Sequence, residues 1–240
     1  MTKARYQRIL LKLSGECLSA ERAEVVFADD GLERVCEELG QVLTLGVEVA
    51  LVVGGGNIFR GGRSAVKGLD RVTADHVGML ATVQNCLVLR DVLTNRGIPA
   101  EIFGAFPIEG MIERMRRDRA LAALRNGSVV LFAGGTGNPF VSTDTAAVLR
   151  ALEIDAQVLL KATKVDGIYD ADPKVVPTAR RFSHLGYREA LERRLAVMDL
   201  AAFSLCMEQG LRVVVFDFSP PGNLRRAVLG EEVGTVLGDR

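Results

Sequence analysis

The sequence contains no tryptophan, and aromatic residues make up only 5% of its 240 residues. Any hydrophobic core must therefore be built mainly from aliphatic side chains. No run of about 18 apolar residues occurs, so we expect no membrane-spanning helix. Lys3, Arg5 and Arg8 lead straight into a short strand-like run without the long apolar segment of a secretory signal. These absences predict a cytoplasmic protein.

Cysteine is scarce, and its four copies, at positions 17, 36, 86 and 206, form no C-x-x-C pair and match no zinc spacing. We expect reduced cysteines packed as small hydrophobic residues. Net charge is absent as well, because 30 basic residues balance 30 acidic ones. No broad basic face for nucleic acid is expected, and any affinity for an anion must be local.

The common nucleotide-binding motifs are also missing. The sequence has no G-x-x-x-x-G-K-[ST] and no G-x-G-x-x-G after an expected strand, which excludes a P-loop enzyme and leaves a Rossmann dinucleotide site unsupported. Protein-kinase signatures are absent too.

Short apolar runs alternate with helical patterns along the chain. Val, Ile and Leu fill the runs with little alternation, which is typical of parallel strands covered on both faces. The expected strands are residues 9–13, 47–53, 100–103, 129–132, 158–160 and 213–216. The expected helices are residues 32–45, 77–93, 120–124 and 145–152. This order predicts an α/β sandwich with a mainly parallel sheet, and the lack of a linker favours one domain over residues 1–240.

Glycine-rich segments follow four of the expected strands, at residues 12–15, 54–57, 134–139 and 161–167. In open α/β sheets, ligands bind beyond the carboxyl ends of the strands. Glycine lets backbone N–H groups approach a phosphate without a Cβ in the way. Several such loops at one edge predict a site that holds several phosphates.

Lys12, at the tip of the first strand, and Arg60, beyond the second, are the cations best placed to stabilise a phosphoryl group in transfer. The alternatives are a solvated lysine for Lys12 and a surface or subunit contact for Arg60. Glycines 54–56 have an alternative too, as turn residues with positive φ. The combination favours an enzyme that transfers a phosphoryl group from ATP to a small acceptor.

Several motifs together resemble those of the bacterial UMP kinases, a family of the amino-acid kinase superfamily. The matching segments are residues 12–16, 54–60, 75–82, 135–140 with 143–144, 161–167, 172–173 and 197–200. They run in order over nearly the whole chain. The resemblance implies a three-layer αβα sandwich and transfer of the ATP γ-phosphoryl group to UMP in pyrimidine nucleotide biosynthesis. It also implies a homohexamer, Mg²⁺ and feedback inhibition by UTP.

The resemblance also assigns site residues. ATP would be bound by Lys12, Leu13, Ser14, Gly15, Gly56, Arg60, Thr163, Tyr169 and Asp172. UMP would be bound by Gly55, Asp75, Thr136, Gly137, Asn138, Pro139, Phe140, Val141, Ser142 and Thr143. We expect Lys12, Arg60 and Asp144 to take part in catalysis, with Asp144 orienting either Lys12 or a Mg²⁺ ion through water. Mg²⁺ is expected to be held mainly by phosphates and water, with few or no protein ligands.

Four acidic or hydroxyl residues have a structural alternative as helix caps. Asp75 precedes an apolar helical stripe, so it either caps that helix or accepts hydrogen bonds from ribose hydroxyls. Thr143 and Asp144 could open the next helix in the same way. Asp199 either lies near the site or caps a helix after residue 198.

Residues 161–185 form the least regular stretch and predict a long functional loop. Within it, Lys161 or Lys164 could reach the β- and γ-phosphates, Tyr169 could stack near adenine, and Asp172 could hold an adenosine hydroxyl. An ordinary Asp-Gly turn followed by an Asp-Pro break explains the glycine and proline of this stretch, but not its lysines.

The chain departs from the family in one segment. Members activated by GTP carry a glycine-containing stretch soon after the first loop, whereas residues 18–27 contain no glycine. This argues against GTP activation. Kinases of acetylglutamate, aspartate or carbamate remain rival enzymes, and a nucleotide-binding regulator without turnover is the rival of another class.

Overall fold

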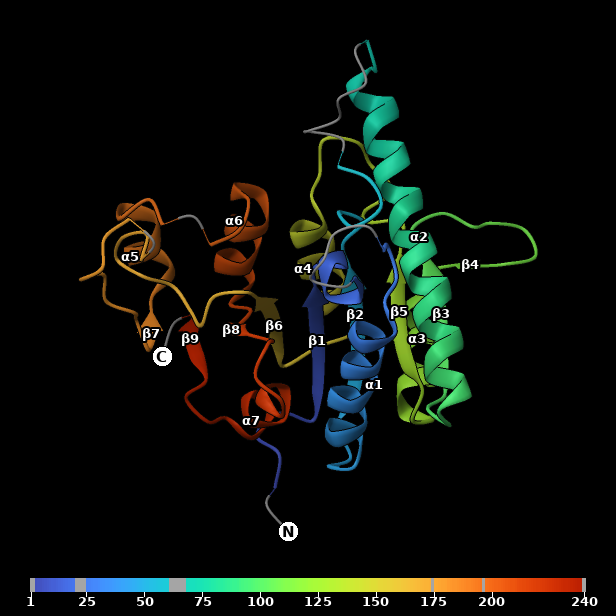
Figure 1. Ribbon diagram of the computed structural model, residues 1–240, viewed down its shortest axis with the longest axis horizontal. Helices are drawn as coiled ribbons and strands as arrows, with labels where there is room; N and C mark the ends of the chain where they lie inside the picture. Colours follow the sequence, from blue (N-terminus) through green and yellow to red (C-terminus); the bar gives the residue numbers. More distant parts are fainter. Residues whose placement is uncertain (1–2, 20–24, 61–67, 174, 196, 239–240) are drawn as a thin grey trace.

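The computed structural model describes residues 3–19, 25–60, 68–173, 175–195 and 197–238. Within these residues, nine strands form one sheet in the order β4-β3-β5-β2-β1-β6-β8-β9-β7 (Figure 1). The strands are β1 (Arg8–Leu13), β2 (Glu48–Val53), β3 (Ala100–Gly104), β4 (Glu113–Arg114), β5 (Val129–Ala133), β6 (Val158–Thr163), β7 (His184–Leu185), β8 (Val213–Asp217) and β9 (Gly234–Leu237). Neighbouring strands run parallel except β8 and β9, as predicted for a mainly parallel sheet.

Helices connect the strands and cover both faces of the sheet. They are α1 (Asp29–Leu43), α2 (Arg71–Asn95), α3 (Arg117–Arg125), α4 (Thr143–Glu153), α5 (Tyr187–Glu192), α6 (Leu200–Gln209) and α7 (Asn223–Leu229), with a 3₁₀ turn η1 (Gly15–Leu18) after β1. Among the described residues, none of these helices is long and apolar enough to span a membrane.

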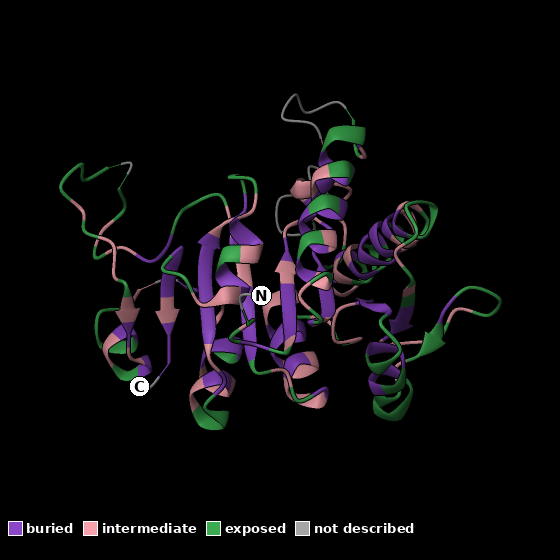
Figure 2. Cartoon of the chain, turned by 90° about the horizontal axis from the view of Figure 1, so that it is seen from below, coloured by how far each residue is buried: buried purple, intermediate pink, exposed green. Residues whose placement is uncertain are grey.

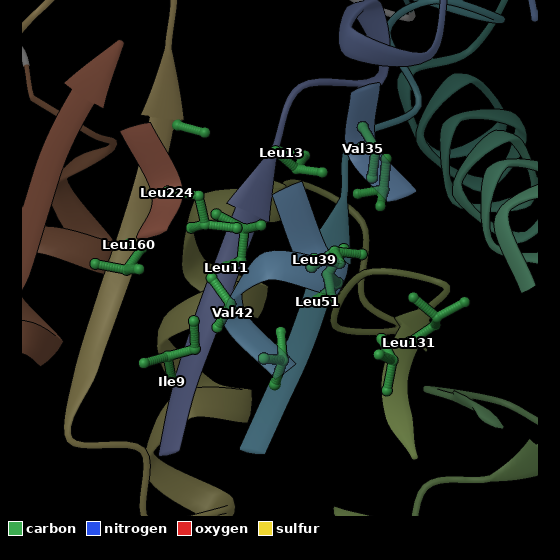
Figure 3. Packing of buried hydrophobic residues seen from close by; sticks show 14 of the residues in the cluster. Ile9, Leu11, Leu13, Val35, Leu39, Val42, Leu51, Leu131, Leu160 and Leu224 are labelled. Atoms are coloured by element: carbon green, nitrogen blue, oxygen red, sulfur yellow. The ribbon is translucent and has the colours of Figure 1, made fainter. Parts of the chain in front are cut away.

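Each central strand is buried on both sides, which gives the molecule its three layers. In β1, Ile9 and Leu11 pack with α1, α2 and α7 in one core, whereas Leu10 packs with α3, α4, α5 and α6 in the other. Figure 3 shows the first core, where side chains of α1 and α7 meet those of β1, β2 and β6, and Figure 2 shows the buried strands between helices. The predicted three-layer αβα sandwich is confirmed.

The six expected strands correspond to β1, β2, β3, β5, β6 and β8, and the four expected helices to α1, α2, α3 and α4. Helix α2 begins well before residue 77, and Asp70 is its N-cap, accepting hydrogen bonds from the N–H groups of Val72 and Thr73. Asp75 therefore lies inside the helix, and its alternative as an N-cap is wrong.

The segment expected as a long loop is irregular in its middle, although residues 161–163 complete β6 and residues 184–185 form β7. Within it, Tyr169 and Arg181 form an antiparallel bridge. Residues 20–24 of the segment 18–27 and residue 174 of the stretch 161–185 lie outside the described residues, as do Gly61 and Gly62, which follow Arg60 in the sequence.

All four cysteines are unpaired, and three of them are buried. Burial raises the pKa of the Cys86 thiol to about 12. Such thiols pack as hydrophobic groups and are unreactive at neutral pH.

Candidate active site

The glycine-rich segments meet at one edge of the sheet. Strands β5, β2, β1 and β6 are neighbours and run parallel, so the loops that follow their carboxyl ends lie side by side. The expected convergence at this edge is confirmed, and the chemistry of the site is set by the side chains that these four strands and their loops place there.

Three charged side chains from different elements form a cluster at this edge. Asp144, in the first turn of α4, receives Lys12 Nζ of β1 at 2.8 Å on one carboxylate oxygen and Lys161 Nζ of β6 at 2.5 Å on the other. Lys161 also donates to the carbonyl of Val197 at 2.6 Å. The three charged side chains are only 12–16% exposed. Asp144 therefore contacts and orients Lys12, and it holds a second ammonium group beside it.

Burial and charge act against each other in this cluster. Burial acts to raise the pKa of Asp144, but the charges of Lys12 and Lys161 outweigh it and hold that pKa below its ordinary value. Burial lowers the pKa of Lys161, and the neighbouring Asp144 carboxylate opposes that shift only in part. Asp144 is thus ionised at neutral pH and stabilises the charged form of Lys161.

A second carboxylate fixes the start of α4. Ser142 is the N-cap of α4, so Thr143 and Asp144 are its first helical residues and not its cap. Asp199 caps α6 through the N–H of Ala202, and it also accepts hydrogen bonds from the hydroxyl of Ser142 and, at 2.9 Å, from that of Thr145. The structure therefore supports the expectation that Asp199 is a helix cap, and this cap joins the first turns of α4 and α6.

Close backbone packing explains two of the glycines. A Cβ on Gly15 would lie 2.1 Å from Asn57 Oδ1 and 2.4 Å from the carbonyl oxygen of Gly54. A Cβ on Gly55 would lie 2.8 Å from the carbonyl oxygen of Gly78 in α2. Neither Gly54, Gly55 nor Gly56 has a positive φ. Their alternative as positive-φ turn residues is therefore wrong.

Asn85, a fully buried residue of α2, holds this loop in place. Its side-chain amide donates to the carbonyl of Gly54 at 2.7 Å and to Asn57 Oδ1 at 2.8 Å. No motif of the sequence pointed to Asn85. The available signal was a polar residue in the middle of the apolar stripe at residues 77–93.

A cavity of about 150 Å³ lies between α2 and the loop after β5. Six residues expected to serve UMP or ATP line it, namely Gly55, Gly56, Asp75, Thr136, Val141 and Thr143. Ala74, Gly78, Met79, Thr82 and Gly135 complete the lining together with Phe59. Thr82 also accepts a hydrogen bond from the Gly134 N–H at 2.8 Å, which fixes the loop against α2.

Asp75 connects the two walls of this cavity. It pairs with Arg71 one turn earlier in α2, at 2.9 Å, and accepts the N–H of Phe140 in the loop at 2.7 Å. Burial acts to raise the pKa of Asp75, but these two partners hold it below its ordinary value. The carboxylate is ionised and able to accept further hydrogen bonds from a ligand.

The remaining residues expected for UMP do not line this cavity. Gly137 has a φ of +80°, and Asn138 donates its N–H to Thr136 Oγ1 at 3.1 Å, so both shape the loop. Phe140 is 67% exposed, with the Arg71 guanidinium 5.6 Å from its ring centre. Pro139 and Ser142 complete this group.

A cavity of about 540 Å³ lies on the other side of the cluster, beside β6 and β8. Thr163, Tyr169 and Asp172, all expected to bind ATP, line it together with Lys161. Its lining also contains larger aliphatic side chains that were not predicted to take part, namely Val165, Ile168, Leu195, Val197 and Val215. The Tyr169 hydroxyl donates to Asp166 at 2.7 Å.

A third cavity, of about 450 Å³, adjoins the second, and Thr163 lines both. Here Glu16 forms ion pairs with Arg60 and, at 3.2 Å, with Lys164. Glu16 belongs to the matching segment 12–16, but the sequence predicted no role for it. A carboxylate is unexpected at a phosphate site, and it neutralises part of the charge of these two cations.

Leu13 and Ser14 shape the backbone of the first glycine segment, Leu13 through its carbonyl and Ser14 through its hydroxyl. The Leu13 side chain is fully buried in the core, and its carbonyl accepts the Gly54 N–H at 2.9 Å. Ser14 caps η1 by accepting the Glu16 N–H. No group of three or more His, Cys, Asp or Glu side chains that could hold a metal ion occurs among the described residues.

Comparison with known proteins gives a consistent result. A model of the amino acid kinase family matches residues 7–217. A uridylate kinase of Legionella pneumophila (strain Paris) is 49% identical over 236 residues, covering 98% of this chain and 95% of that protein. The UMP kinase structure from Bacillus anthracis has a TM-score of 0.94 at 40% identity, covering 98% of this chain and 96% of that one. The UMP kinase structure from Ureaplasma parvum has a TM-score of 0.92 at 30% identity, covering 98% and 100%.

Proposed function

The chain belongs to the amino acid kinase family and, within it, to the uridylate kinases, and on this premise we propose that it transfers the γ-phosphoryl group of ATP to UMP, giving ADP and UDP. The observation that carries this function is the cluster of Lys12, Asp144 and Lys161 between two cavities. Thr143, next to Asp144, lines the smaller cavity, and Lys161 lines the larger. The reaction belongs to pyrimidine nucleotide biosynthesis.

The lysines bring two anions together. A phosphate oxygen of UMP attacks the γ-phosphorus, the new P–O bond forms, and the bond to the β,γ-bridging oxygen breaks, leaving its electrons on ADP. Such transfer needs positioning and charge stabilisation more than covalent chemistry. Lys12 and Lys161 project from neighbouring strands, and Asp144 fixes both ammonium groups. They are thus placed to stabilise the charge on the transferred group.

UMP binds in the smaller cavity. Helix α4 begins at Thr143, so its positive end faces the acceptor phosphate, together with the hydroxyls of Thr136 and Thr143. Asp75 accepts hydrogen bonds from the ribose. Gly55 and Gly56 let the backbone come close to the phosphate.

ATP binds on the other side of the cluster. Tyr169 and Asp172 contact adenosine in the larger cavity, and its aliphatic lining covers the base. Thr163 lines both the larger cavity and the third cavity. The phosphates of ATP therefore extend past Thr163 into the third cavity, toward Arg60 and Lys164. Glu16 releases these two cations as the phosphates bind them.

The charges at the site fit a requirement for Mg²⁺. The four cations Lys12, Arg60, Lys161 and Lys164 are partly neutralised by Asp144 and Glu16, and the phosphates of ATP and UMP carry more negative charge than the remainder offsets. Both carboxylates already have cationic partners. Mg²⁺ is therefore held mainly by nucleotide phosphates and water, and it supplies further neutralisation when bound.

A substrate panel tests the proposal. ADP release is measured with UMP, CMP, dCMP, acetylglutamate, aspartate and carbamate, and we expect UMP to be strongly preferred. Lys12→Ala is expected to lower kcat by roughly 10²–10³ while nucleotide binding, measured by calorimetry, is retained. Binding of ATP and UMP by the wild type without ADP release would instead favour a regulator.

UTP carries the same uridine and is the expected feedback inhibitor. Inhibition is tested with UMP held low, and unchanged rates at saturating UTP would contradict it. GTP is expected not to activate, because residues 18–27 lack glycine. Comparing initial rates with and without GTP tests this directly.

A homohexamer in the cytoplasm is the expected assembly. Val77 and Leu80 of α2 are 37% and 48% exposed, and Figure 1 shows this end of α2 standing beyond the sheet. These apolar groups are available for a subunit interface. Sedimentation of the wild type and of Leu80→Glu tests this assembly.

The sheet joins strands from both ends of the chain, which supports treating residues 1–240 as one domain.

A further inference from the structure

A single buried hydroxyl joins the outer wall of the larger cavity to the sheet. Thr235 of β9 is fully buried. Its Oγ1 accepts the N–H of Ile168 at 2.8 Å and donates to the carbonyl oxygen of Phe182. Ile168 lies in the first arm and Phe182 in the second arm of the irregular segment between β6 and β7. The Thr235 side chain therefore contacts both arms.

The two arms pair with each other, and the second arm continues into β7, which pairs with β9. Phe182 donates its N–H to the carbonyl of Ile168 at 2.9 Å, and Asp170 donates to that of Arg180 at 3.1 Å. The ion pair of Arg181 with Asp166 is partly exposed, with side-chain exposures of 29% and 52%. Exposed pairs of this kind contribute little to stability. The second arm is also held to β9 by the Val236 N–H, which donates to the carbonyl of Ser183 at 3.0 Å. Thr235 is therefore the side chain that ties the first arm, through Ile168, to β9.

The backbone is shaped to reach this hydroxyl. Gly167 has a φ of +152°, and a Cβ there would lie 2.6 Å from Thr235 Oγ1. A side chain at position 167 would push the first arm away from β9. The close approach thus depends on a glycine next to Ile168 and a small hydroxyl residue on the strand.

Thr235 also sits beneath the cavity. In the antiparallel pair of β8 and β9 it lies opposite Val215, and Val215 lines the cavity with Ile168. We propose that Thr235 is a positioning residue for ATP, which fixes the wall carrying Tyr169 and Asp172 at its distance from the floor formed by β6 and β8. This inference rests on the proposed function, because it takes the cavity as the adenosine site.

Replacing the hydroxyl by a methyl group in Thr235→Val leaves the Ile168 N–H and the Phe182 carbonyl buried without this partner. We expect KM for ATP to rise about fivefold to fiftyfold, the range expected from losing one buried hydrogen-bonded group. The rate at saturating ATP and KM for UMP stay within about twofold of the wild type, because the lysine cluster and the UMP cavity do not touch Thr235. Thr235→Ser keeps the hydroxyl and restores KM for ATP.

The test measures initial rates with each substrate varied at saturation of the other, and ATP binding by calorimetry. Glu38→Gln is the control. Glu38 caps α7 through the Leu224 N–H at 3.0 Å, in the layer on the opposite face of the sheet, so its loss lowers Tm without touching the ATP cavity. If Thr235→Val does not fold, Thr235→Ala replaces it, since alanine removes the hydroxyl without adding a methyl group in its place.

Three results would overturn the inference. They are an unchanged KM for ATP in the hydroxyl-free variant, equal impairment of Thr235→Ser, or an equal rise of KM for ATP in Glu38→Gln. A wild-type protein without ATP-dependent turnover would overturn the proposed function itself. An intact wild type with an unaffected Thr235→Val would overturn only the role of Thr235.

Discussion

Replacement of Asp144 by asparagine removes the negative charge that holds two lysines in the site. Its side chain is 16% exposed and pairs with Lys12 and Lys161. Removing one partner of a buried ion pair costs roughly 3–5 kcal/mol. For a chain of this length, each kcal/mol lowers Tm by about 2–4 °C, so we expect Asp144→Asn to lower Tm by about 6–20 °C.

The same change alters catalysis and its pH dependence. With both ammonium groups free to move, kcat is expected to fall by roughly 10²–10³. Asp144 raises the pKa of Lys161 against the effect of burial. Without it that pKa falls further below the ordinary 10.5, so Lys161 loses its proton at a lower pH. The alkaline limb of the kcat profile therefore shifts to lower pH in the variant.

The pH dependence of stability follows from the lowered pKa of Asp144. A carboxyl group with a lowered folded-state pKa stabilises the fold above its unfolded pKa, near 3.8, and loses that contribution as the pH falls through the folded value. The difference in Tm between wild type and variant should therefore be full at neutral pH and shrink only in strong acid.

Asp118→Asn is the matched control. Asp118 is an ion-paired aspartate too, with Arg116 as its partner at 2.7 Å, but both side chains are more than 60% exposed. Calorimetric unfolding and steady-state rates should not distinguish this variant from the wild type. Equal Tm, kcat and alkaline limb in Asp144→Asn and wild type would refute the argument that the carboxylate organises the lysines.

Four further variants test the loops and the ion pairs of Glu16 and Asp75. Gly15→Ala should lower Tm and abolish ATP binding, because its Cβ would lie 2.1 Å from Asn57 Oδ1. Gly56→Ala should fold normally, because its Cβ would lie 3.5 Å from the nearest atom, Arg60 Nε. Calorimetry of both variants checks this. Glu16→Gln frees two cations for phosphate and should lower KM for ATP about twofold to fivefold, on the scale of a partly exposed ion pair; a rise would show that Glu16 assists ATP instead. Asp75→Asn should raise KM for UMP and leave KM for ATP unchanged, and steady-state rates at pH 7 measure both.

The sequence predicted the central strands because burial on both faces leaves a strong pattern. In runs such as 47–53 every residue except Glu48 is apolar, and the glycine segments directly follow these runs. Elements with little pattern were missed. Strands β4 and β7 have two residues each, and helices α5 and α7 have six and seven, too few for a helical period to show.

Other features of the site depend on contacts between distant parts of the chain. Helix α6 is apolar on most of its surface, so no amphipathic pattern marks it. Asp75 was placed too near the start of α2 because the first turns, from Arg71 to residue 76, are mostly polar, although Ala74 is buried, and the apolar stripe begins only after them. The pairing of Lys161 with Asp144 links β6 to α4, and no local spacing encodes it.

The double role of Asp199 bears on how the two substrates influence each other. It caps α6 while it holds Ser142, at the end of the loop that lines the smaller cavity, and Val197 nearby accepts a hydrogen bond from Lys161, which lines the larger cavity. The first turns of both helices are thus tied together. A nucleotide that orders this loop will also order the residues beside Lys161. Thermodynamic linkage makes the effect reciprocal. Each nucleotide should then bind more tightly when the other is already in place.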